Sequence, residues 1–188
     1  MKVLIMFSGG IDSAYLVERA IHAGHEVVIH HVSLRNKFNR WQLELEAVNN
    51  LLHLWRDRGY KFKYSTSIID NTELPMTQDA YYTSSLASVI CSKDLTIDDA
   101  WLGFLVHEDY NIEYYERVFN AGISKMPSHS YQGTSKARLA YPLITFSKLD
   151  VVNSISGTAL ALTWSCRTPD SGEPCGNCST CNALKKLK

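Results

Sequence analysis

A glycine-rich segment near the start of the chain has the composition of a phosphate-binding loop. Residues 7–13 read FSGGIDS and come directly after a short apolar run. Gly9 and Gly10 carry no Cβ that would keep an anion at a distance, and the hydroxyls of Ser8 and Ser13 can donate hydrogen bonds to phosphate oxygens. A turn from a strand into a helix also presents backbone N–H groups and the positive end of the helix dipole. The predicted nucleotide-binding residues of this segment are Phe7, Ser8, Gly9, Gly10, Asp12 and Ser13.

Asp12 must act differently from its neighbours in this segment, because a carboxylate repels phosphate. It could hold a magnesium ion or cap the following helix. The glycine spacing matches neither G-x-x-x-x-G-K-S/T nor G-x-G-x-x-G, the two common glycine-rich nucleotide motifs. Spacing alone therefore leaves open an ordinary strand-to-helix turn that is capped by Asp or Ser.

The second candidate site is a cluster of cysteines close to the end of the sequence. Of five cysteines, Cys91 stands alone, and the others follow the pattern C-x8-C-x2-C-x2-C within CRTPDSGEPCGNCSTC. Four thiolates complete a tetrahedral Zn²⁺ shell and leave no open position for catalysis, so we expect a structural zinc site. Disulfides and an iron–sulfur cluster are the alternatives. The predicted ligands are Cys166, Cys175, Cys178 and Cys181.

The composition predicts one compact domain over residues 1–188, with residues 164–188 as a zinc-binding segment. The 188 residues are 45% hydrophobic and 20% charged, which suits a chain that buries one sizeable core. The 19 basic and 19 acidic residues balance, so no direct nucleic-acid partner and no anionic membrane surface is expected. The apolar run at the amino terminus is shorter than the core of a signal peptide, and we expect a cytoplasmic protein without a membrane span.

Short β-branched runs alternate with helical patterns along the chain, which predicts an α/β fold. We expect strands at Val3–Phe7, Val27–Val32, Phe62–Ser67 and Ala100–Val106, and helices at Ser13–Ala23, Trp41–Arg58, Tyr81–Cys91, Ile112–Ala121 and Lys148–Ser156. Strands separated by helices need crossover connections, so the predicted architecture is a Rossmann-like, doubly wound parallel sheet with helices on both faces. Ligands bind such sheets beyond the carboxyl ends of the strands.

Local signals mark several boundaries. Gly24, Gly59 and Gly122 each follow the last residue of a helical pattern, where a left-handed conformation favours glycine. The sequence SKLD at residues 147–150 has the form of a capping box that opens the last helix. The polar, turn-rich stretch Lys125–Arg138 predicts a long surface loop of the kind that often serves an active site.

The segment SGGIDS after an amino-terminal strand resembles the S-G-G-x-D-S motif of the ATP pyrophosphatases, the PP-loop superfamily. The resemblance implies an adenine nucleotide alpha hydrolase-like fold that uses ATP and Mg²⁺. It also implies attack of a substrate oxygen on the α-phosphorus, with pyrophosphate as the leaving group. By the same resemblance Lys148, in PLITFSKLDVV, lies near the phosphates, and Asp12, Ser13 and Lys148 form the catalytic set. The alternative for Lys148 is an exposed lysine in a first helical turn, although a cation there opposes the helix dipole.

Further stretches narrow this resemblance. PLITFSK, LTWSC with the cysteine spacing after it, and HHVSLRNKFNRWQLELEAV, which is similar to a Q-R-H-x-x-E-like region, resemble the 7-cyano-7-deazaguanine synthases of queuosine biosynthesis (QueC). The resemblance implies that 7-carboxy-7-deazaguanine and ammonia are converted into the nitrile in two ATP-dependent steps, through an adenylated acid and an amide. It further implies a structural Zn²⁺ and a homodimer.

The middle of the chain departs from that family. Where a G-R-N-type segment is expected the sequence reads PMTQDAYYTSSLA. Where D-Y-S-G-Y-P-D-C-R is expected it reads VHEDYNIEYYERVF, which keeps only Asp109 and Tyr110. In the family these segments line the substrate side, so the resemblance carries over the nucleotide half of the site and leaves the other half open.

Other functions therefore remain as alternatives. One is a PP-loop enzyme that adenylates a different substrate, such as an amide ligase, an RNA-thiolating enzyme or an enzyme that modifies a macromolecule. A thiolating enzyme would need Cys91, the one cysteine outside the metal set. Another alternative is a relative that binds ATP without turnover.

A few more residues lie near the predicted ligand edge. His30 and His31 end the second strand near where adenine would lie, and His31 is added to the predicted nucleotide-binding residues; a hydrogen-bonded scaffold role is the alternative. His107–Asp109 follow the fourth strand at the same edge. An aromatic group could stack on a base, although helix packing is the simpler explanation: Tyr81, Tyr82, Tyr114 and Tyr115.

Overall fold

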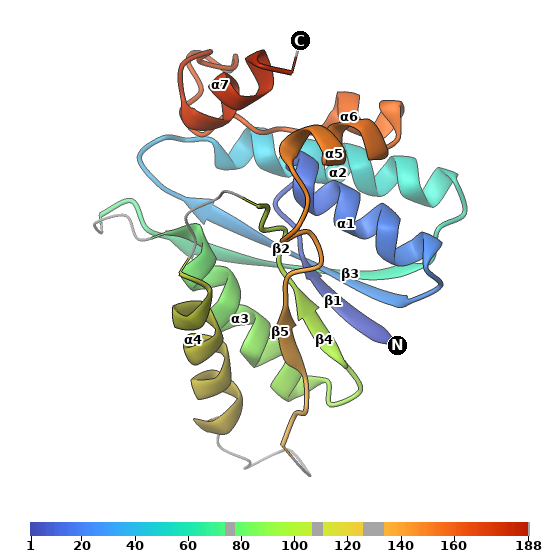
Figure 1. Cartoon of the computed structure of the whole chain (residues 1–188). Coiled ribbons are helices and arrows are strands. Elements are labelled where there is room, and N and C mark those ends of the chain that lie inside the picture. The colour runs from blue at the N-terminus through green and yellow to red at the C-terminus, as the bar shows by residue number, and fades with distance from the viewer. Residues whose placement is uncertain (74–77, 107–110, 126–133, 188) are drawn as a thin grey trace.

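A parallel sheet of five strands runs through the centre of the molecule (Figure 1). The structure is a computed structural model that describes residues 1–73, 78–106, 111–125 and 134–187. Within these residues the strands are β1 (Lys2–Met6), β2 (Glu26–Arg35), β3 (Phe62–Asp70), β4 (Asp99–Trp101) and β5 (Arg138–Ala140). They pair in parallel, in the order β3-β2-β1-β4-β5. The apolar strand β1 is buried along its whole length, as a central strand covered on both faces must be.

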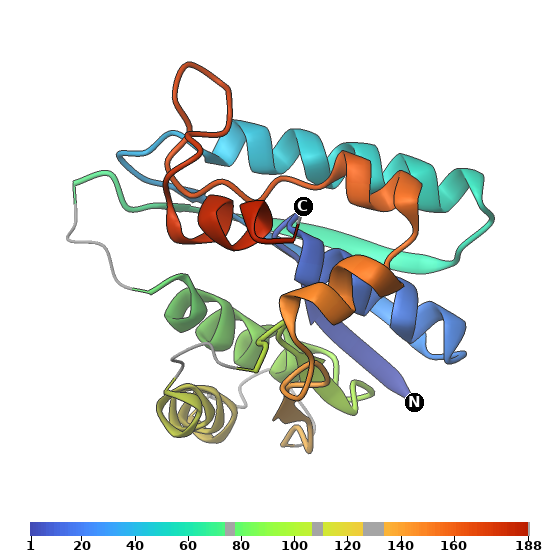
Figure 2. The ribbon, with the colours of Figure 1, turned by 45° about the horizontal axis from the view of Figure 1, so that its top comes forward.

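Helices cover both faces of the sheet. The helices in the described residues are α1 (Ile11–His22), α2 (Trp41–Asp57), α3 (Asp79–Lys93), α4 (Ile112–Lys125), α5 (Lys148–Ser154), α6 (Gly157–Leu162) and, in the cysteine segment, α7 (Ser179–Lys185). Helices α1, α2, α5 and α6 cover one face, and α3 and α4 cover the other (Figure 1; Figure 2). Trp55 of α2 is fully buried in the first layer and Phe119 of α4 in the second. The doubly wound fold predicted from the sequence is confirmed.

The strand order creates a crevice at the carboxyl end of β1. The chain winds from β1 outward through β2 to β3 and then returns to the other side of β1 to form β4 and β5. The helices that follow β1 and β4 therefore lie on opposite faces of the sheet (Figure 1). Such a switch point is where open α/β sheets bind their ligands. The glycine-rich segment starts at this point.

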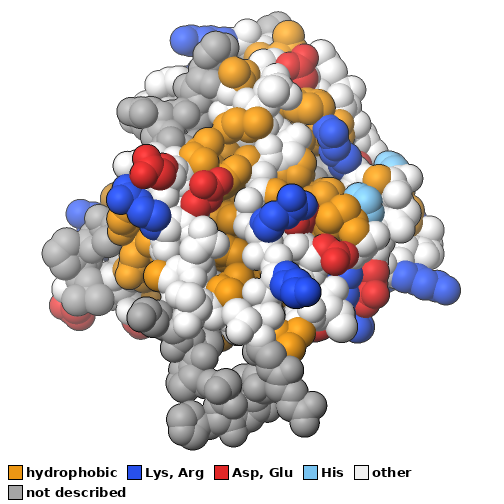
Figure 3. All heavy atoms as spheres, turned by 60° about the horizontal axis from the view of Figure 1, so that its bottom comes forward, with side chains coloured by type: hydrophobic (Ala, Val, Ile, Leu, Met, Phe, Trp, Pro, Cys, Tyr) orange, Lys and Arg blue, Asp and Glu red, His pale blue; other side chains and the backbone are white. Residues whose placement is uncertain are grey.

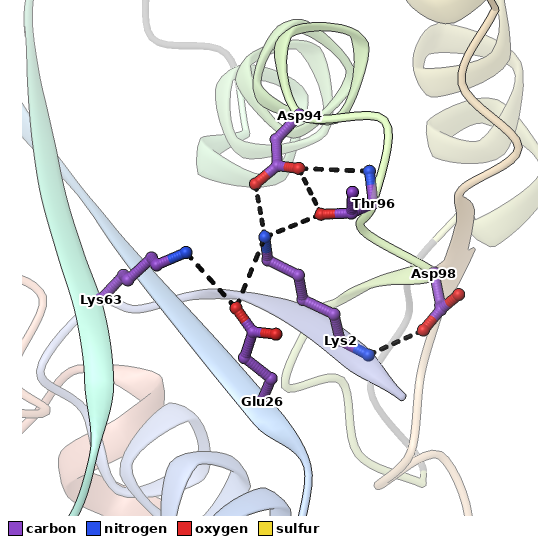
Figure 4. Close-up of polar contacts among 6 residues, drawn as sticks. All are labelled: Lys2, Glu26, Lys63, Asp94, Thr96 and Asp98. Carbon is purple, nitrogen blue, oxygen red and sulfur yellow. Dashed lines mark hydrogen bonds and ion pairs between the residues drawn. The ribbon is translucent and has the colours of Figure 1, made fainter.

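The opposite, amino-terminal edge of the sheet is closed by polar contacts around Lys2 (Figure 4). The ammonium of Lys2 donates to Asp94 (2.6 Å) and to the Thr96 hydroxyl (2.8 Å), and it lies 3.5 Å from Glu26. The backbone N–H of Lys2 donates to Asp98 (2.7 Å). These contacts tie β1 to β2 and to the segment that leads from α3 into β4.

Replacing Lys2 by methionine, which keeps most of the apolar stem, should lower the free energy of unfolding at pH 7. Hydrogen bonds from Lys2 and Thr96 lower the pKa of Asp94 to about 2. Because that pKa is below the ordinary 3.8, the contribution exists above pH 4 and disappears as the pH falls toward 2. We expect Lys2→Met to cost about 1 kcal/mol at pH 7 after allowance for the solvent screening of this partly exposed carboxyl.

Urea unfolding of Lys2→Met at pH 7 and at successively lower pH measures this contribution. The matched control is Lys63→Met, because Lys63 also contacts Glu26 but its side chain is 69% exposed. The control should stay within about 0.5 kcal/mol of the wild type. An equal loss in both variants, or a loss in Lys2→Met that does not shrink below pH 4, would contradict the assignment.

Two glycine predictions hold in the first helix layer, and one in the second layer is wrong. Gly24 and Gly59 have positive φ angles of 75° and 77° after their helices, as predicted, whereas Gly122 lies inside α4, which continues to Lys125. A Cβ at Gly122 would overlap the side chain of Ser88 in α3. This glycine therefore permits close packing of two helices and does not end one.

The fourth strand is also shorter than predicted. The sequence predicts pairing over Ala100–Val106, but β4 ends at Trp101. The next apolar residues, among them Leu102 and Leu105, are buried in the two cores outside the sheet. A short apolar run looks the same in the sequence whether its residues pair with a strand or pack against helices.

Several short elements were not predicted, namely β5, α6 and α7. The predicted loop over Lys125–Arg138 overlaps α4 and β5 at its two ends, and residues 126–133 lie outside the described residues. His107–Asp109 also lie outside them. None of the helices in the described part of the chain is both long enough and apolar enough to cross a membrane.

Candidate active site

A cavity of about 570 Å³ lies at the carboxyl ends of β1 and β4. Segments from across the chain form its walls: residues 8–13 without Gly9, residues 102–104 after β4, the starts of α2, α3 and α5, and residues 164–167. Gly103 lets the segment after β4 approach the loop, because a Cβ there would lie 3.3 Å from the backbone nitrogen of Ser13. The cavity therefore occupies the switch point of the sheet.

The glycine-rich loop forms one wall of this cavity. Gly9 has a φ of +79°, and a Cβ on it would lie 2.9 Å from the carbonyl oxygen of Glu44, so the position requires glycine. The hydroxyls of Ser8 and Ser13 lie 3.1 Å apart, and the Ser8 N–H donates to Ser13 Oγ (3.2 Å). Gly10 begins α1 without a side-chain cap, so the first N–H groups of this helix are available to an anion.

Asp12 and Lys148, which are 136 residues apart in the sequence, meet at this wall. The ammonium of Lys148 donates to Asp12 Oδ2 over 2.5 Å, and both side chains are largely buried. Lys148 is the first residue of α5, where Ser147 and Asp150 form the predicted capping box. Its side chain is 17% exposed, so it is not the exposed lysine of the alternative reading. The second carboxylate oxygen of Asp12 is buried and has no partner among the described residues.

Phe7 and His31 lie behind the loop. The Phe7 side chain packs on Trp55 in the core, with ring centroids 5.4 Å apart. His31 is fully buried, and its Nδ1 lies 2.9 Å from the Phe7 carbonyl oxygen. Burial lowers the pKa of His31, so the ring is neutral and its Nδ1–H donates to that carbonyl. His31 thus supports the loop through its hydrogen bond to Phe7, and it is not among the residues that line the cavity. Contact between His31 and a nucleotide stays a prediction.

His30 is likewise buried and hydrogen-bonded to a neighbouring segment. Its Nδ1 lies 2.8 Å from the Ser65 hydroxyl on the neighbouring strand β3. Burial, together with the adjacent His31, lowers the pKa of His30 to about 4. The ring is therefore neutral at physiological pH and ties β2 to β3, which agrees with the scaffold alternative.

A cluster of charged side chains forms another part of the cavity wall, and the sequence analysis did not single it out. Arg40 lies between two carboxylates: its Nε is 3.1 Å from Glu44, and it donates a hydrogen bond to Asp79. Arg167 approaches the same Asp79 oxygen to 3.7 Å. Burial raises the pKa of Glu44 to about 7, although Arg40 acts in the opposite direction. The only signal in the sequence was the Arg–Glu spacing of four residues at the start of α2.

The four clustered cysteines come together as predicted. Their sulfur atoms all lie within 4.8 Å of one another, close enough to hold one metal ion. Backbone N–H groups donate to the sulfurs: Cys175 to Cys166 (3.3 Å), Cys178 to Cys175 (3.4 Å) and Cys181 to Cys178 (3.5 Å). The geometry therefore fits the predicted zinc site.

The cysteine segment also forms part of the cavity. The backbone N–H of Trp164 donates to the carbonyl oxygen of Gly9 (3.0 Å), and this hydrogen bond joins the cysteine segment to the glycine-rich loop. Cys166 and Arg167 line the cavity next to it. Figure 2 shows this segment, in red, folded over the side of the sheet where the loop lies. The predicted metal ligand Cys166 and the glycine-rich loop thus line the same cavity.

The charge of the surface agrees with the balanced composition. On the face in Figure 3, basic and acidic side chains lie beside one another and do not gather by sign. The described part of this face carries no broad basic area of the kind that contacts a nucleic-acid backbone.

Comparison with known proteins identifies the family. Residues 84–186 match the model of "Queuosine biosynthesis protein QueC". A 7-cyano-7-deazaguanine synthase of Syntrophus aciditrophicus is 25% identical over 221 residues, covering 98% of this chain and 91% of the relative. Another, of a Nitratiruptor species, is 27% identical over 211 residues, covering 99% and 93%.

A solved structure supports the fold. The U34-tRNA thiolase NcsA from Methanococcus maripaludis, with its 4Fe-4S cluster, superposes with a TM-score of 0.56 at 13% identity. The superposition covers 100% of this chain, which spans 65% of the thiolase, and the likeness concerns the fold alone. The family model matches more than half of the 188 residues, from the middle of α3 to the cysteine segment. The protein therefore belongs to the QueC family of queuosine biosynthesis proteins.

Proposed function

We propose that this protein is a 7-cyano-7-deazaguanine synthase. It would convert 7-carboxy-7-deazaguanine and ammonia into the nitrile in two ATP-dependent steps, through an adenylated acid and an amide. The observation that carries the proposal is the contact between Asp12 and Lys148 at the glycine-rich loop, inside the cavity at the switch point. The family and the names of the relatives support the choice of substrate.

The loop residues suit the first half-reaction. A carboxylate oxygen of the substrate attacks the α-phosphorus of ATP, the bond to the β-phosphate oxygen breaks, and pyrophosphate leaves. Negative charge grows on the leaving group, and the N–H groups at the start of α1, the hydroxyls of Ser8 and Ser13, and the ammonium of Lys148 are placed to stabilise it. Ammonia then attacks the acyl carbon and releases AMP, which gives the amide.

The second half-reaction repeats the same chemistry on the amide. The amide oxygen attacks the α-phosphorus of a second ATP, and pyrophosphate leaves again. Loss of AMP and of the remaining amide protons then gives the nitrile. No side chain has to form a covalent bond with the substrate, so one phosphate site can serve both steps.

The donor sets fit the two metals of the proposal. Asp12 Oδ1 is buried and has no partner in the described part of the chain. It is the hard oxygen ligand that Mg²⁺ prefers, and Mg²⁺ bound there would supply positive charge next to the phosphates. A tetrahedral zinc site sets its sulfurs at about 3.8 Å from one another, within the separation of the four cysteines here. An iron–sulfur cubane binds its cysteines on different irons and holds them farther apart, so this set favours Zn²⁺.

Cys91 argues against sulfur transfer. It is fully buried in α3, and burial raises its pKa to about 12, so its thiolate is scarce at physiological pH. It does not line the cavity. The remaining cysteines all belong to the metal set. These observations favour the synthase over an RNA-thiolating enzyme.

The proposal is tested by incubating the purified protein with Mg-ATP, ammonium and 7-carboxy-7-deazaguanine and following pyrophosphate and the small molecules by mass spectrometry. We expect the nitrile to appear with two pyrophosphates per molecule. Omission of ammonium should stop the reaction at the adenylated acid, with one pyrophosphate per site at most. Absence of acid-dependent pyrophosphate release from metal-replete, ATP-binding protein would refute the proposal.

A further inference from the structure

The cavity wall has two chemically different parts, which we call the phosphate end and the charged end. The loop and Lys148 form the phosphate end, which serves the reacting carboxyl group. The cluster of Arg40, Glu44, Asp79 and Arg167 forms the charged end and is not used by the adenylation chemistry. The part of the chain that opens α3 there is also where the sequence departs from the family's G-R-N-type pattern. A role for this end therefore has to be found in this chain's own residues.

Asp79 is the residue at the charged end that has a hydrogen-bond acceptor available for a ligand. Its Oδ2 accepts from Arg40 and lies near Arg167, whereas its Oδ1 is buried and has no donor among the described residues. A buried carboxylate oxygen without a donor is unfavourable unless a ligand supplies one. Each carboxylate oxygen has two lone pairs, so Oδ2 can accept a further bond as well. Asp79 can thus receive two parallel N–H donors.

The orientation of Asp79 is fixed by its neighbours. Arg40 is almost completely buried, and its Nε forms an ion pair with Glu44 at 3.1 Å. Glu44 in turn belongs to the turn of α2 that packs on Gly9 of the loop. The acceptor is therefore held by residues that also contact the glycine-rich loop.

A 7-deazaguanine skeleton carries chemical groups that suit both parts of the cavity wall. Its 7-carboxyl group is on the five-membered ring, and its N1–H and 2-amino donors lie side by side on the far edge of the six-membered ring. A molecule with its carboxyl at the phosphate end therefore has two parallel N–H groups available for the charged end. A carboxylate is the acceptor that suits such a pair.

We infer that Asp79 is the residue that selects the substrate, by accepting hydrogen bonds from the N1–H and the 2-amino group of the 7-deazaguanine ring. This inference rests on the proposed function. It adds that Asp79 is the acceptor and that the substrate ring must carry both N–H donors on one edge. It predicts that the 2-amino group contributes to binding through Asp79 and through no other residue.

The test compares two ligands and four proteins by calorimetry, with the α,β-methylene analogue of ATP present so that no turnover occurs. The ligands are 7-carboxy-7-deazaguanine and the analogue that lacks its 2-amino group. The wild type should bind the first roughly 30-fold more tightly than the second, and Asp79→Asn should discriminate less than about 3-fold. Asp79→Glu, which keeps the carboxylate, should restore part of the discrimination.

The matched control is Asp99→Asn, because Asp99 also pairs with an arginine, Arg138 at 3.1 Å, but lies at the amino edge of the sheet. It should discriminate like the wild type. Unchanged affinity for the ATP analogue shows that Asp79→Asn is folded. If Asp79→Asn discriminates as well as the wild type, the inference is overturned while the proposed function stands. If the wild type binds neither ligand, the proposed function fails and the inference fails with it.

Discussion

Asp12→Ala should reduce pyrophosphate release by about 10³-fold and leave the fold intact. The substitution removes two oxygens: Oδ2, which accepts from the Lys148 ammonium at 2.5 Å, and Oδ1, which has no partner among the described residues and suits Mg²⁺. In the proposed mechanism Lys148 and Mg²⁺ both stabilise the charge that develops on the leaving pyrophosphate. The fold should persist because α1 is anchored by its apolar face, including Leu16 and Val17, which are fully buried.

Steady-state pyrophosphate release and thermal unfolding of the same preparations measure the two effects. Lys148→Met should lose a similar factor, and the double variant should lose little more, because the two residues act as one pair. Asp57→Ala, at the exposed end of α2, is the matched control and should retain wild-type activity. A turnover within tenfold of the wild type in Asp12→Ala would remove Asp12 from the catalytic set.

Short sequence patterns predict the local structure around some residues of this site. These are the residues whose geometry is determined by their neighbours in the chain. The glycine-rich loop depends on a glycine at a positive φ beside a helix start, and the capping box of Ser147 and Asp150 depends on residues three positions apart. The cysteines likewise lie within one short segment. In each case the backbone is shaped locally, so the order of residue types is sufficient to predict it.

The remaining features depend on contacts between distant parts of the chain. Arg40, Asp79 and Arg167 come from three different segments and meet only because the strand order brings the starts of α2 and α3 beside the cysteine segment. Helix α6 could not be placed for the same reason. Its start is capped by Glu18 of α1, which accepts from the Ser156 N–H over 3.0 Å across 138 residues. No local pattern encodes such a partner.

Cys178→Ser should remove the metal, lower the melting temperature by roughly 10 °C and weaken ATP binding about tenfold. Cys178 is predicted to act in two ways, because its sulfur is one of the four predicted ligands and also accepts a hydrogen bond from the Cys181 N–H at the start of α7. Loss of the metal should release the segment that carries Trp164. Its hydrogen bond to Gly9 would then no longer hold the loop in the conformation that receives phosphate.

Metal content by mass spectrometry, thermal unfolding and calorimetric ATP binding separate these effects. The matched control is Cys91→Ser, which removes a buried thiol outside the metal set and should keep a full complement of metal and unchanged ATP affinity. Removal of metal from the wild type by a chelator should reproduce the weaker ATP binding of Cys178→Ser. If ATP binding stays unchanged without the metal, the cysteine segment stabilises the fold but does not support the loop, and the contact between Trp164 and Gly9 carries no functional coupling.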